Sequence, residues 1–502
     1  MTRTLFALLA LAVSGCASAQ APAPEAPALP ASGGWADDPL RAVAEAVPTP
    51  EPLTASGAMQ QRGAAWQTVA PAILEHIQTP RIPDRTCAIT DHGAVSGDGA
   101  DDLPAILAAI EACAEAGGGR VLVPEGEWLA RGPVHLRSRI DLHLASGATL
   151  RFSADPDDYP LVLTRWEGTF LFNYSPLVYA RGLEDVAITG AGTLDGQAAE
   201  GWAEWKQLQE PAKDRLRQMG IDRVPVEDRV FGDGWYLRPS LVQFFDCDRV
   251  LIEGVTLRES PFWTTHLVLN EHVTVRGVTI RPGTTNDDGI DPDGSRFVLI
   301  EDNDIWTYDD AIALKAGRDA DGRASRPTQY VVIQRNRLRS SVGGAMSVGS
   351  EMSGGVEWVF VRDVVAENDG GHGLYIKSNR DRGGFVRHLY LRDIDVLDAA
   401  DGFLITTDYK GFRGTDHPPE VHDVHLDGVR VWFAREVSVR LLGQPDNPVR
   451  RVSLADVQIR GEVAWPVFRE ASGVIADSVS VGGRPFRAED AASADGQPGP
   501  RY

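Results

Sequence analysis

A short pattern of alternating apolar and polar residues recurs along the chain from residue 186 onward. Its copies begin at residues 186, 250, 273, 298, 331, 359, 389, 424 and 452, as in 250-VLIEGVTL and 273-VTVRGVTI. Each copy places β-branched residues or leucine at alternate positions, then a polar or glycine pair, then a second short strand. From residue 250 onward the starts are 23 to 35 residues apart. Such a spacing is typical of repeat proteins.

These repeats predict an all-β chain folded as a right-handed parallel β-helix. A unit of about 25 residues is long enough for three short strands and three turns, wound as one coil that stacks on the next. Blades of a β-propeller, at about 40 to 50 residues, fit the spacing poorly. Ahead of the repeats, Asp101, Asp102 and Pro104 open a predicted helix. We expect that helix to cap the N-terminal end of the coil.

The first 19 residues are typical of an export signal. One basic residue precedes an apolar run from Leu5 to Val13, which is too short to span a bilayer. Two cleavage sites fit equally well. The run ending at Cys16 resembles a bacterial lipobox, in which that cysteine is lipidated, whereas residues 17–19 form an ordinary A-x-A site. We expect a protein that is periplasmic, an outer-membrane lipoprotein or extracellular.

The remaining chain divides into three segments. Residues 20–80 are predicted as an Ala/Pro-rich linker and N-terminal extension, residues 81–485 as the β-helix domain, and residues 486–502 as a disordered tail. No segment after the signal is long and apolar enough to span a membrane. Residues 195–239 interrupt the repeats and carry Trp202, Trp205, Trp235 and Tyr236. This insert is either an aromatic wall for sugars or a helical loop that packs its own tryptophans.

Charge and cysteines limit the partners. The 71 acidic and 49 basic residues give a net charge of −22, which weighs against nucleic acid or an anionic membrane. Cys87 and Cys113 could form a disulfide in an oxidising compartment. Cys247 is expected to be a small buried residue. We expect a monomer.

An acidic cluster, 286-NDDGIDPDGS-295, precedes 309-DDAIALK-315. An EF-hand is excluded because its glutamate position would fall on Ile300. Asp288 and Asp310 are 22 residues apart, close to one coil. With Asp309 they should therefore gather on adjacent strands roughly 4.8 Å apart. Neighbouring carboxylates raise one another's pKa values, as glycoside hydrolysis requires. Catalysis is the favoured interpretation, with a metal site and a structural cluster as alternatives.

The chain resembles the polygalacturonase family, glycoside hydrolase family 28, over about residues 82–470. The resemblance rests on long, unusual motifs: 91-DHGAVSGDGADD-102, 164-TRWEG-168, 173-NYSPLVYA-180, 188-ITGAGTLDG-196, 237-LRPSLVQF-244, 260-SPFWTTH-266, 309-DDAIALKAGRDADG-322 and 348-VGSEMSGGV-356. It implies the β-helix fold and a pectic poly- or oligosaccharide as substrate. It implies neither a cofactor nor a catalytic metal ion.

The same resemblance assigns roles to individual residues. Asp309 would be the general acid, while Asp288 and Asp310 would hold and deprotonate the attacking water of an inverting mechanism. Asp287 stands where the family has threonine, and its extra charge could raise neighbouring pKa values. Asp291 and Asp293 have no counterpart and are expected to shape a turn. The substrate is expected to contact four further residues: Asn286, Lys315, Lys377 and Tyr375.

Two positions depart from the family. Gly343 occupies the place of a histidine, and Tyr375 replaces an arginine, whereas Lys377 remains. Arginine binds a carboxylate with two parallel hydrogen bonds, and tyrosine offers one neutral donor and a stacking face. We therefore expect rhamnogalacturonan or another decorated galacturonan rather than plain galacturonan. His372 is expected to be structural or at the cleft edge, and Lys315 either contacts a substrate carboxylate or neutralises the acidic cluster.

Two other functions remain open on this fold. One is a Ca²⁺-dependent polysaccharide lyase that uses an arginine or lysine base. The other is a non-catalytic β-helix that binds carbohydrate, which the missing histidine and arginine favour.

Overall fold

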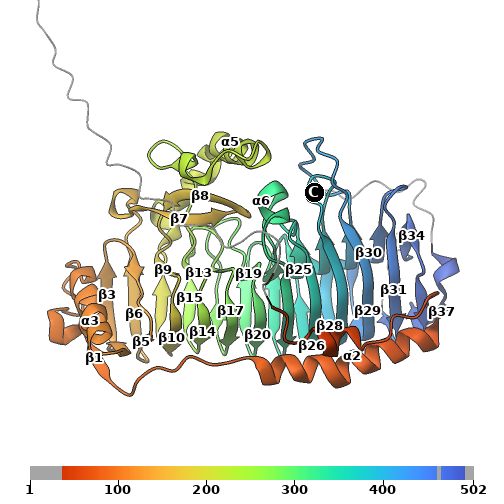
Figure 1. Cartoon of the computed structure of the whole chain (residues 1–502), viewed down its shortest axis with the longest axis horizontal. Coiled ribbons are helices and arrows are strands. Elements are labelled where there is room, and N and C mark those ends of the chain that lie inside the picture. The colour runs from red at the N-terminus through yellow and green to blue at the C-terminus, as the bar shows by residue number, and fades with distance from the viewer. Residues whose placement is uncertain (1–34, 36, 461–464, 492–502) are drawn as a thin grey trace, which may run out of the picture.

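The computed structural model describes residue 35, residues 37–460 and residues 465–491. They form one elongated stack of coils, with the chain running from one end to the other (Figure 1). The predicted signal peptide, Cys16 and residues 492–502 of the predicted tail lie outside this part of the chain. No helix within it is both long and apolar enough to cross a membrane.

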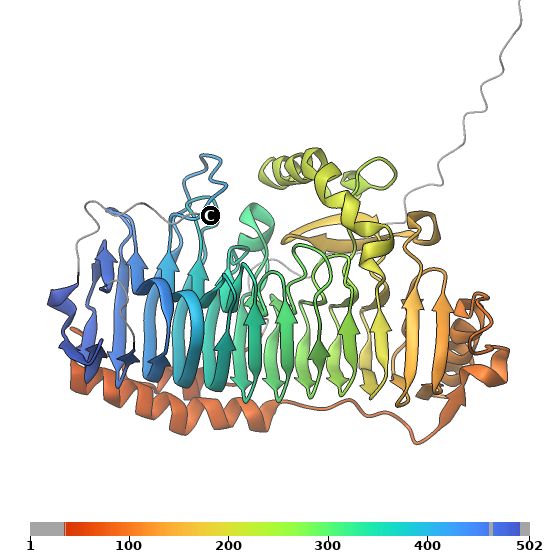
Figure 2. The same cartoon turned by 180° about the vertical axis from the view of Figure 1, so that it is seen from behind.

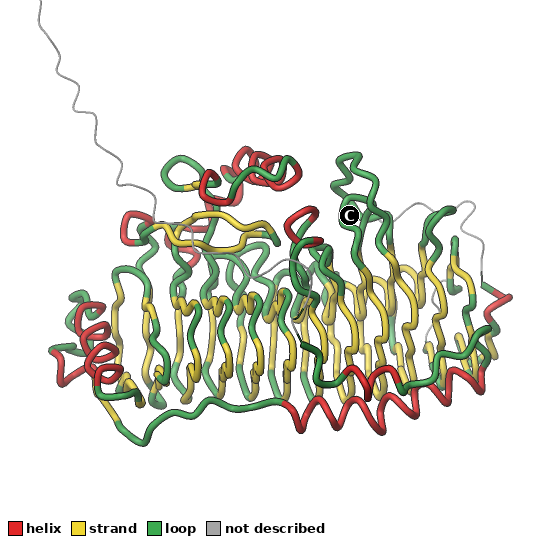
Figure 3. The backbone as a smooth tube through the Cα atoms, viewed as in Figure 1, coloured by secondary structure: helices red, strands yellow, loops and turns green. Residues whose placement is uncertain are grey.

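Three parallel ladders run along the stack, and the strand runs of Figure 3 follow them. The first, here the repeat ladder, contains β1 (Thr86–Ala88), β2 (Gly119–Val123), β5 (Ile140–Leu144), β10 (Glu184–Gly190), β14 (Asp248–Glu253), β17 (Glu271–Arg276), β20 (Arg296–Glu301), β23 (Thr328–Gln334), β26 (Val356–Glu367), β28 (Phe385–Thr406), β29 (Glu420–Val431), β31 (Val449–Ala455) and β35 (Ile475–Asp477).

The second, the edge ladder, contains β3 (Gly126–Ala130), β6 (Ala148–Phe152), β11 (Thr193–Asp195), β15 (Thr256–Arg258), β18 (Thr279–Ile280), β21 (Asp304–Thr307), β24 (Arg337–Ser340), further parts of β26, β28 and β29, β32 (Gln458–Ile459) and β36 (Val479–Val481). Near its end, β37 (Arg484–Phe486) pairs with β36, and β34 (Ala471–Ser472) pairs with β31.

The third, the aspartate ladder, contains β4 (Val134–His135), β9 (Val178–Arg181), β13 (Val242–Phe245), β16 (Thr265–Val268), β19 (Ile290–Asp293), β22 (Ile312–Leu314), β25 (Gly344–Gly349), β27 (His372–Lys377), the last part of β28, β30 (Ala434–Leu442) and β33 (Val467–Arg469).

The register confirms the predicted repeats. The first residues of successive copies pair across the repeat ladder, as in Val186 with Val250, Val250 with Val273, and Val273 with Val298. All three of the paired residues from 250 to 298 are fully buried. The alternating pattern therefore places one side of each strand in the interior of the coil, which is the predicted parallel β-helix.

The predicted capping helix is α3 (Leu103–Glu115). It lies at the N-terminal end of the stack (Figure 1). Its buried residues Ile106, Ala109 and Ile110 join the core of the first coils, so they shield apolar groups that the end coil would otherwise expose to water. A disulfide between Cys87 and Cys113 ties strand β1 to this helix.

The structure changes the picture of the predicted linker and N-terminal extension. Within residues 20–80, α1 (Arg41–Glu45) and α2 (Ala55–His76) are helical, and α2 runs along the outside of the stack (Figure 2). Its residues Ala65, Val69 and Ile73 pack with aromatic side chains on the outer face of the repeat ladder. Broken helical periodicity hid this helix, because polar Gln61 and Arg62 are also buried, bonded to Asp423 and Ser453.

The insert and a hairpin stand over the aspartate ladder (Figure 1). The insert forms α4 (Trp202–Leu208), α5 (Glu210–Ile221) and β12 (Val230–Phe231), and the hairpin consists of β7 (Leu161–Trp166) and β8 (Thr169–Tyr174). Strand β12 extends the hairpin into a three-stranded sheet. A short helix, α6 (Asp319–Arg323), follows β22 on the same side.

Candidate active site

Three aspartates meet where β19 and β22 begin. Ile290 pairs with Ile312 across the aspartate ladder, so residues 22 apart are in register. One oxygen from each of Asp288, Asp309 and Asp310 lies within 4.8 Å of the others. Asp288 and Asp310 are nearly inaccessible to solvent. The expectation that one coil's spacing gathers these carboxylates is confirmed.

Asp310 is held as an ionised carboxylate. Its Oδ1 accepts hydrogen bonds from the Gly344 amide at 2.7 Å and the Ser347 hydroxyl at 2.8 Å. Its Oδ2 accepts one from the Lys377 ammonium, also at 2.8 Å. Burial alone would raise the pKa of Asp310, but the charges of Lys377 and Lys315 outweigh it and hold that pKa below its ordinary value.

Asp309 is partly exposed, and its pKa is shifted in the opposite direction to that of Asp310. Burial, followed by the neighbouring charge of Asp310, raises the pKa of Asp309. The Asn286 side-chain amide donates to its Oδ2 at 3.1 Å. Asn286 itself has a left-handed backbone, with φ of 64°, and its Oδ1 accepts from the Lys206 ammonium at 2.8 Å. Asn286 therefore links the predicted acid to the insert.

Asp288 and Lys315 form a buried ion pair of 3.0 Å. Burial, together with the charges of Asp291, Asp309 and Asp310, raises the pKa of Asp288 well above its ordinary value, although Lys315 opposes the rise. The Lys315 ammonium also lies 4.2 Å from the centroid of the Trp263 ring. Lys315 therefore neutralises the acidic cluster, while the same side chain also lines the pocket.

Asp287 is not part of this trio, and its side chain binds backbone amides. Its carboxylate accepts hydrogen bonds from the amides of Gly283, Tyr308 and Asp309, at 2.8, 2.9 and 3.0 Å. Burial raises the pKa of Asp287 to about 6, despite these three donors. The aspartate that replaces the family's threonine thus fastens the turn carrying Asp309 to the coil carrying Asp288.

The expectation that Asp291 and Asp293 shape a turn is wrong. Both are fully buried within β19. Asp293 binds the Arg165 guanidinium at 2.9 Å and lies 3.1 Å from the His266 Nε2, which ties the hairpin to the ladder. Asp291 lies 3.5 Å from the Lys315 ammonium. The proline and glycine around them suggested a turn, whereas burial in the ladder decided their role.

Of the two departures from the family, Gly343 has a steric basis and Tyr375 lies outside the pocket lining. A Cβ atom at Gly343 would lie 2.6 Å from Asp310 Oδ1, and one at Gly344 would lie 2.3 Å from the Ser347 hydroxyl oxygen. A larger side chain at Gly343 would displace Asp310 itself, and one at Gly344 would displace the Ser347 hydroxyl that donates to Asp310. Tyr375 is buried in a cluster with apolar side chains such as Leu404, and it is not among the residues that line the pocket.

His372 has a structural environment. Its Nδ1 lies 3.1 Å from a carboxylate oxygen of Asp401, which is fully buried, and its ring lies 4.4 Å from that of Tyr375. It does not line the pocket described next.

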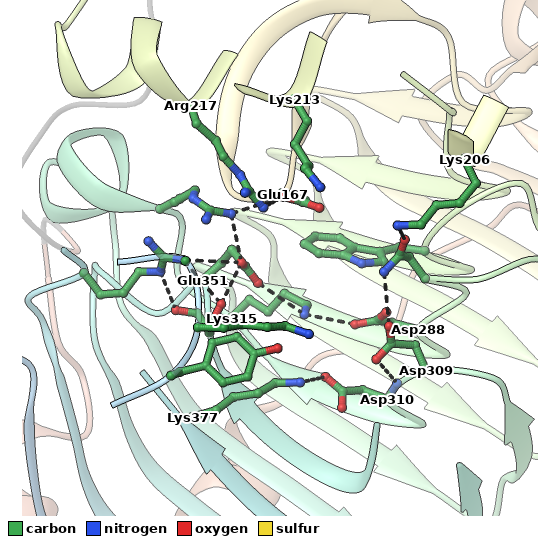
Figure 4. A pocket seen from close by; sticks show the side chains of 18 residues that line it. Glu167, Lys206, Lys213, Arg217, Asp288, Asp309, Asp310, Lys315, Glu351 and Lys377 are labelled. Carbon is green, nitrogen blue, oxygen red and sulfur yellow. Dashed lines mark hydrogen bonds and ion pairs between the residues drawn. The ribbon is translucent and has the colours of Figure 1, made fainter. Parts of the chain in front are cut away.

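The aspartates form part of the floor of a pocket of about 330 Å³ (Figure 4). Its lining includes five acidic side chains and eight basic ones, although the whole chain carries a net charge of −22. The basic residues are Lys206, Lys213, Arg217, Lys315, Arg318, Lys377, Arg382 and Lys410. With every side chain ionised, the pocket is positive inside a strongly negative protein.

Lysine is confined to this pocket. The chain contains only five lysines among its 49 basic residues, and all five line the pocket. Lys213, Lys315 and Lys377 each lie within ion-pair distance of a carboxylate. For Lys206 and Lys410, no carboxylate lies within 4.0 Å in the described part of the chain.

Most of the basic lining was not predicted from the sequence. Lys206, Lys213 and Arg217 come from α4 and α5, and Lys410 from the loop after β28. These segments lie outside the repeats, so no register places them. Glu351 and Arg318 do lie in motifs that carried the family resemblance. Glu351 binds Arg318 at 3.1 Å. Those motifs could therefore have been used to predict this part of the pocket lining.

The insert's aromatic residues pack against one another. Trp202 is fully buried and contacts Trp205, which in turn contacts Tyr236, and Trp235 contacts Phe231. None of these rings lines the pocket. The helical-loop interpretation of residues 195–239 therefore fits, and what the insert brings to the pocket is positive charge.

Comparisons with known proteins agree with this geometry. Residues 233–471 match the model of "Glycosyl hydrolases family 28". A probable polygalacturonase of Vitis vinifera is 30% identical over 406 residues, which cover 77% of each chain. An endo-polygalacturonase of Pectobacterium carotovorum is 26% identical over 78% of this chain and 90% of its own.

A solved structure is also similar. The exopolygalacturonase from Thermotoga maritima superimposes with a TM-score of 0.78 at 36% identity, covering 83% of this chain and 96% of its own. With the β-helix and the aspartate trio, these matches give one conclusion: the chain belongs to glycosyl hydrolase family 28 and is a glycosidase that hydrolyses glycosidic bonds.

Proposed function

We propose that this glycosidase acts on pectic polysaccharide and cleaves the bond beside a galacturonate residue. The observation that carries the proposal is the excess of basic over acidic side chains in the pocket, against a net charge of −22. A local positive field in a concave site attracts and orients an anionic sugar. Its relatives of known name include polygalacturonases from a plant and a bacterium.

The galacturonate carboxylate has two natural partners. Lys206 and Lys410 line the pocket with no carboxylate within 4.0 Å among the residues the structure describes, whereas the other six basic side chains each have one within that distance. Burial, followed by the charges of Arg238 and Lys213, lowers the pKa of Lys206. A bound carboxylate would relieve that cost. These lysines take the place of the arginine that Tyr375 replaces.

This assignment changes the expected substrate. The missing arginine favoured rhamnogalacturonan or another decorated galacturonan, but the pocket gathers cations from other segments instead. Both polymers present a galacturonate, so the carboxylate contact alone does not choose the neighbouring sugar. A panel of galacturonan and rhamnogalacturonan oligosaccharides, with products resolved by size, identifies the linkage that is cleaved. Inactivity on every galacturonate-containing oligosaccharide contradicts the proposal.

The roles in catalysis follow from the pKa directions. Asp309, whose pKa is raised, suits the general acid that protonates the glycosidic oxygen. Asp310, which is held ionised by Lys377, suits the group that positions the attacking water. Asp288 has a raised pKa and one oxygen engaged by Lys315, so it suits the base that takes the proton from that water.

We propose inversion of the anomeric carbon. The carboxylate oxygens lie within 4.8 Å of one another, closer than the roughly 6.5–9.5 Å between carboxyl groups usual for inverting glycosidases. However, both oxygens of Asp310 already accept hydrogen bonds, and one oxygen of Asp288 is held in its ion pair with Lys315, so neither carboxylate is free to form a covalent intermediate. NMR of the first product distinguishes the mechanisms, since a retained anomer would require a covalent intermediate.

We further propose attack at a chain end. Lys206 and Arg238 of the insert bind Asn286, and Asp214 of α5 pairs with Arg413 of the loop after β28. The insert therefore contacts both the coil of Asp288 and a loop of the later coils, which supports a pocket enclosed by the insert. The similar structure from Thermotoga maritima is named an exopolygalacturonase. Release of monomer or dimer from the start of the reaction, with little loss of viscosity, is the expected result.

The product of the reaction distinguishes hydrolysis from the elimination that a polysaccharide lyase would catalyse. Hydrolysis releases a reducing end without a double bond, whereas elimination produces an unsaturated sugar that absorbs in the ultraviolet. The aspartate trio with a protonated acid fits hydrolysis, and we expect reducing sugar without that absorbance. The same assay tests the non-catalytic alternative, which requires no product at all.

We also infer export as a monomer. The Cys87–Cys113 disulfide is typical of an oxidising compartment. The mass of the mature protein separates a lipidated Cys16 from cleavage after residue 19, and light scattering tests the monomer.

A further inference from the structure

Exposed hydrophobic side chains concentrate along one edge of the stack. Twelve large hydrophobic residues are exposed in the described part of the chain, and half of them lie on or beside the edge ladder. We call these six the aromatic edge: Trp306, Tyr308, Val342, Leu397, Trp432 and Phe433. A contiguous exposed apolar surface marks a binding site more often than scattered residues do.

The six residues follow the stacked turns of neighbouring coils, with the coil of β26 contributing none of them. The amide of Val342 donates to the Tyr308 carbonyl at 2.9 Å, and the amide of Trp432 donates to the Val396 carbonyl at 2.8 Å. From β21 through β24, β26 and β28 to β29 there are four strand steps. The row therefore extends about 19 Å along the axis of the stack, at roughly 4.8 Å for each step.

This row begins at the catalytic residues and leads away from the insert. Tyr308 directly precedes Asp309, and its amide binds Asp287. On the earlier coils the corresponding turns bind the insert, because Arg238 donates to the carbonyls of Pro261 and Thr285. A sugar chain that leaves the pocket toward the later coils on this side passes the aromatic edge.

The chemistry of the row suits an anionic sugar chain. Arg339 lies 4.5 Å from the centroid of the Trp306 ring, and Arg460 lies 4.1 Å from that of Trp432. Nearby carboxylates are neutralised in ion pairs of 2.6 to 2.8 Å, namely Arg339–Asp369, Arg430–Asp395 and Arg435–Asp398. Aromatic faces stack on the C–H faces of sugar rings, and guanidinium groups bind carboxylates.

We propose that the aromatic edge binds the part of the pectic chain that extends beyond the pocket, several sugars from the bond that is cleaved. The occupant is the substrate polymer itself. This inference rests on the proposed function, since the pocket and the edge would hold one continuous chain. It predicts that the enzyme prefers long substrates to short ones.

The test separates the edge from the pocket by substrate length. Trp432→Ala with Phe433→Ala should lower kcat/KM on polygalacturonate roughly tenfold, the size expected for two lost aromatic contacts. The value on a digalacturonide, which fills only the pocket, should not change. Phe433→Ala alone should show a smaller loss of the same kind, which guards against a folding defect from the Trp432 change.

A matched pair supplies the control. Leu397→Ala removes an exposed leucine from the edge and should lower kcat/KM on polygalacturonate. Leu107→Ala removes an equally exposed leucine from α3 and should leave that value unchanged. Affinity gel electrophoresis in polygalacturonate measures binding without turnover. Mobility should be retarded for the parent and less so for the edge variants.

The outcomes are distinct. If the edge variants are retarded in the gel as much as the parent, the proposed binding at the aromatic edge is wrong. An equal loss of kcat/KM on digalacturonide and on polygalacturonate also contradicts it. If the parent forms a dimer at high concentration and these variants do not, the surface binds a second copy of the chain, and the proposal is overturned. Polymer binding that depends on the edge but yields no product from any galacturonide supports the edge and contradicts the proposed function instead.

Discussion

The floor and the roof of the pocket are built in different ways. The floor includes Asp288, Asp310 and Lys377, which lie in or beside strands β19, β22 and β27 of the aspartate ladder and are fixed by its register. Lys206 and Lys410 of the roof come from an insert and a loop between coils. We infer that the floor performs the chemistry and the roof selects the substrate. Changes to the floor should therefore act on every substrate, and changes to the roof on anionic ones.

Removal of the acid should have the largest effect. Asp309→Asn keeps the shape of the side chain and its neighbours but cannot donate a proton as a carboxylic acid does. We expect kcat to fall about 10³-fold on every cleavable substrate, within the range for loss of general acid catalysis. Steady-state kinetics with an unchanged melting temperature would confirm a chemical effect. Activity near that of the parent would remove Asp309 from the mechanism.

Loss of the floor's cation should come next. Lys377→Met deletes the ammonium that holds the pKa of Asp310 low. Without it the pKa of Asp310 rises, so the acidic limb of the kcat profile should move to higher pH, and kcat below that limb should fall roughly 100-fold. Lys377→Arg keeps the charge and should restore much of the profile. A profile that does not move would mean that Asp310 does not set that limb.

The roof lysines should affect selection. Lys206→Met with Lys410→Met should lower kcat/KM on galacturonides roughly 10- to 100-fold, mainly through KM, as for a lost hydrogen bond to a charged group. Substrates that lack the carboxylate should be used no worse than before. Replacement by arginine is the charge-matched control. An equal loss of kcat on charged and neutral substrates would break the distinction between floor and roof.

The lysines also offer a chemical version of this test. Because all five lysines line the pocket, an amine-directed reagent should modify the pocket and the N-terminus alone. Saturating galacturonide should slow labelling of Lys206 and Lys410, as followed by peptide mass spectrometry. Labelling that is insensitive to galacturonide would show that neither lysine contacts the bound sugar.

The smallest effect should come from the link between the two coils of the floor. Asp287→Thr replaces three accepted backbone hydrogen bonds with one hydroxyl. We expect kcat to fall about fivefold with little change in KM, since one neutral hydrogen bond contributes about 1 kcal/mol and Asp309 is only displaced. Asp287→Asn should be intermediate. A change in KM alone would instead indicate contact with the substrate.

Parts of the fold and site could be predicted because they repeat. The alternating pattern gave the strands, and its spacing gave a register that brings Asp288 to Asp310. Helix α2 escaped prediction because its buried face carries Gln61 and Arg62, whose partners lie more than 300 residues away. Asp291 and Asp293 were misjudged because the proline and glycine beside them indicate a turn, whereas their partners lie elsewhere in the fold. Arg165 lies in the hairpin, and Lys315 lies one coil later.

The sequence by itself determined the β-helix and the gathering of Asp288, Asp309 and Asp310, because both depend on a local period that adjacent coils must share. Only the tertiary structure decided the charge of the pocket. Its cations come from segments that follow no period, and a net charge of −22 conceals a positive site. Electrostatic selection depends on where charges gather in space, and their number along the chain does not reveal it.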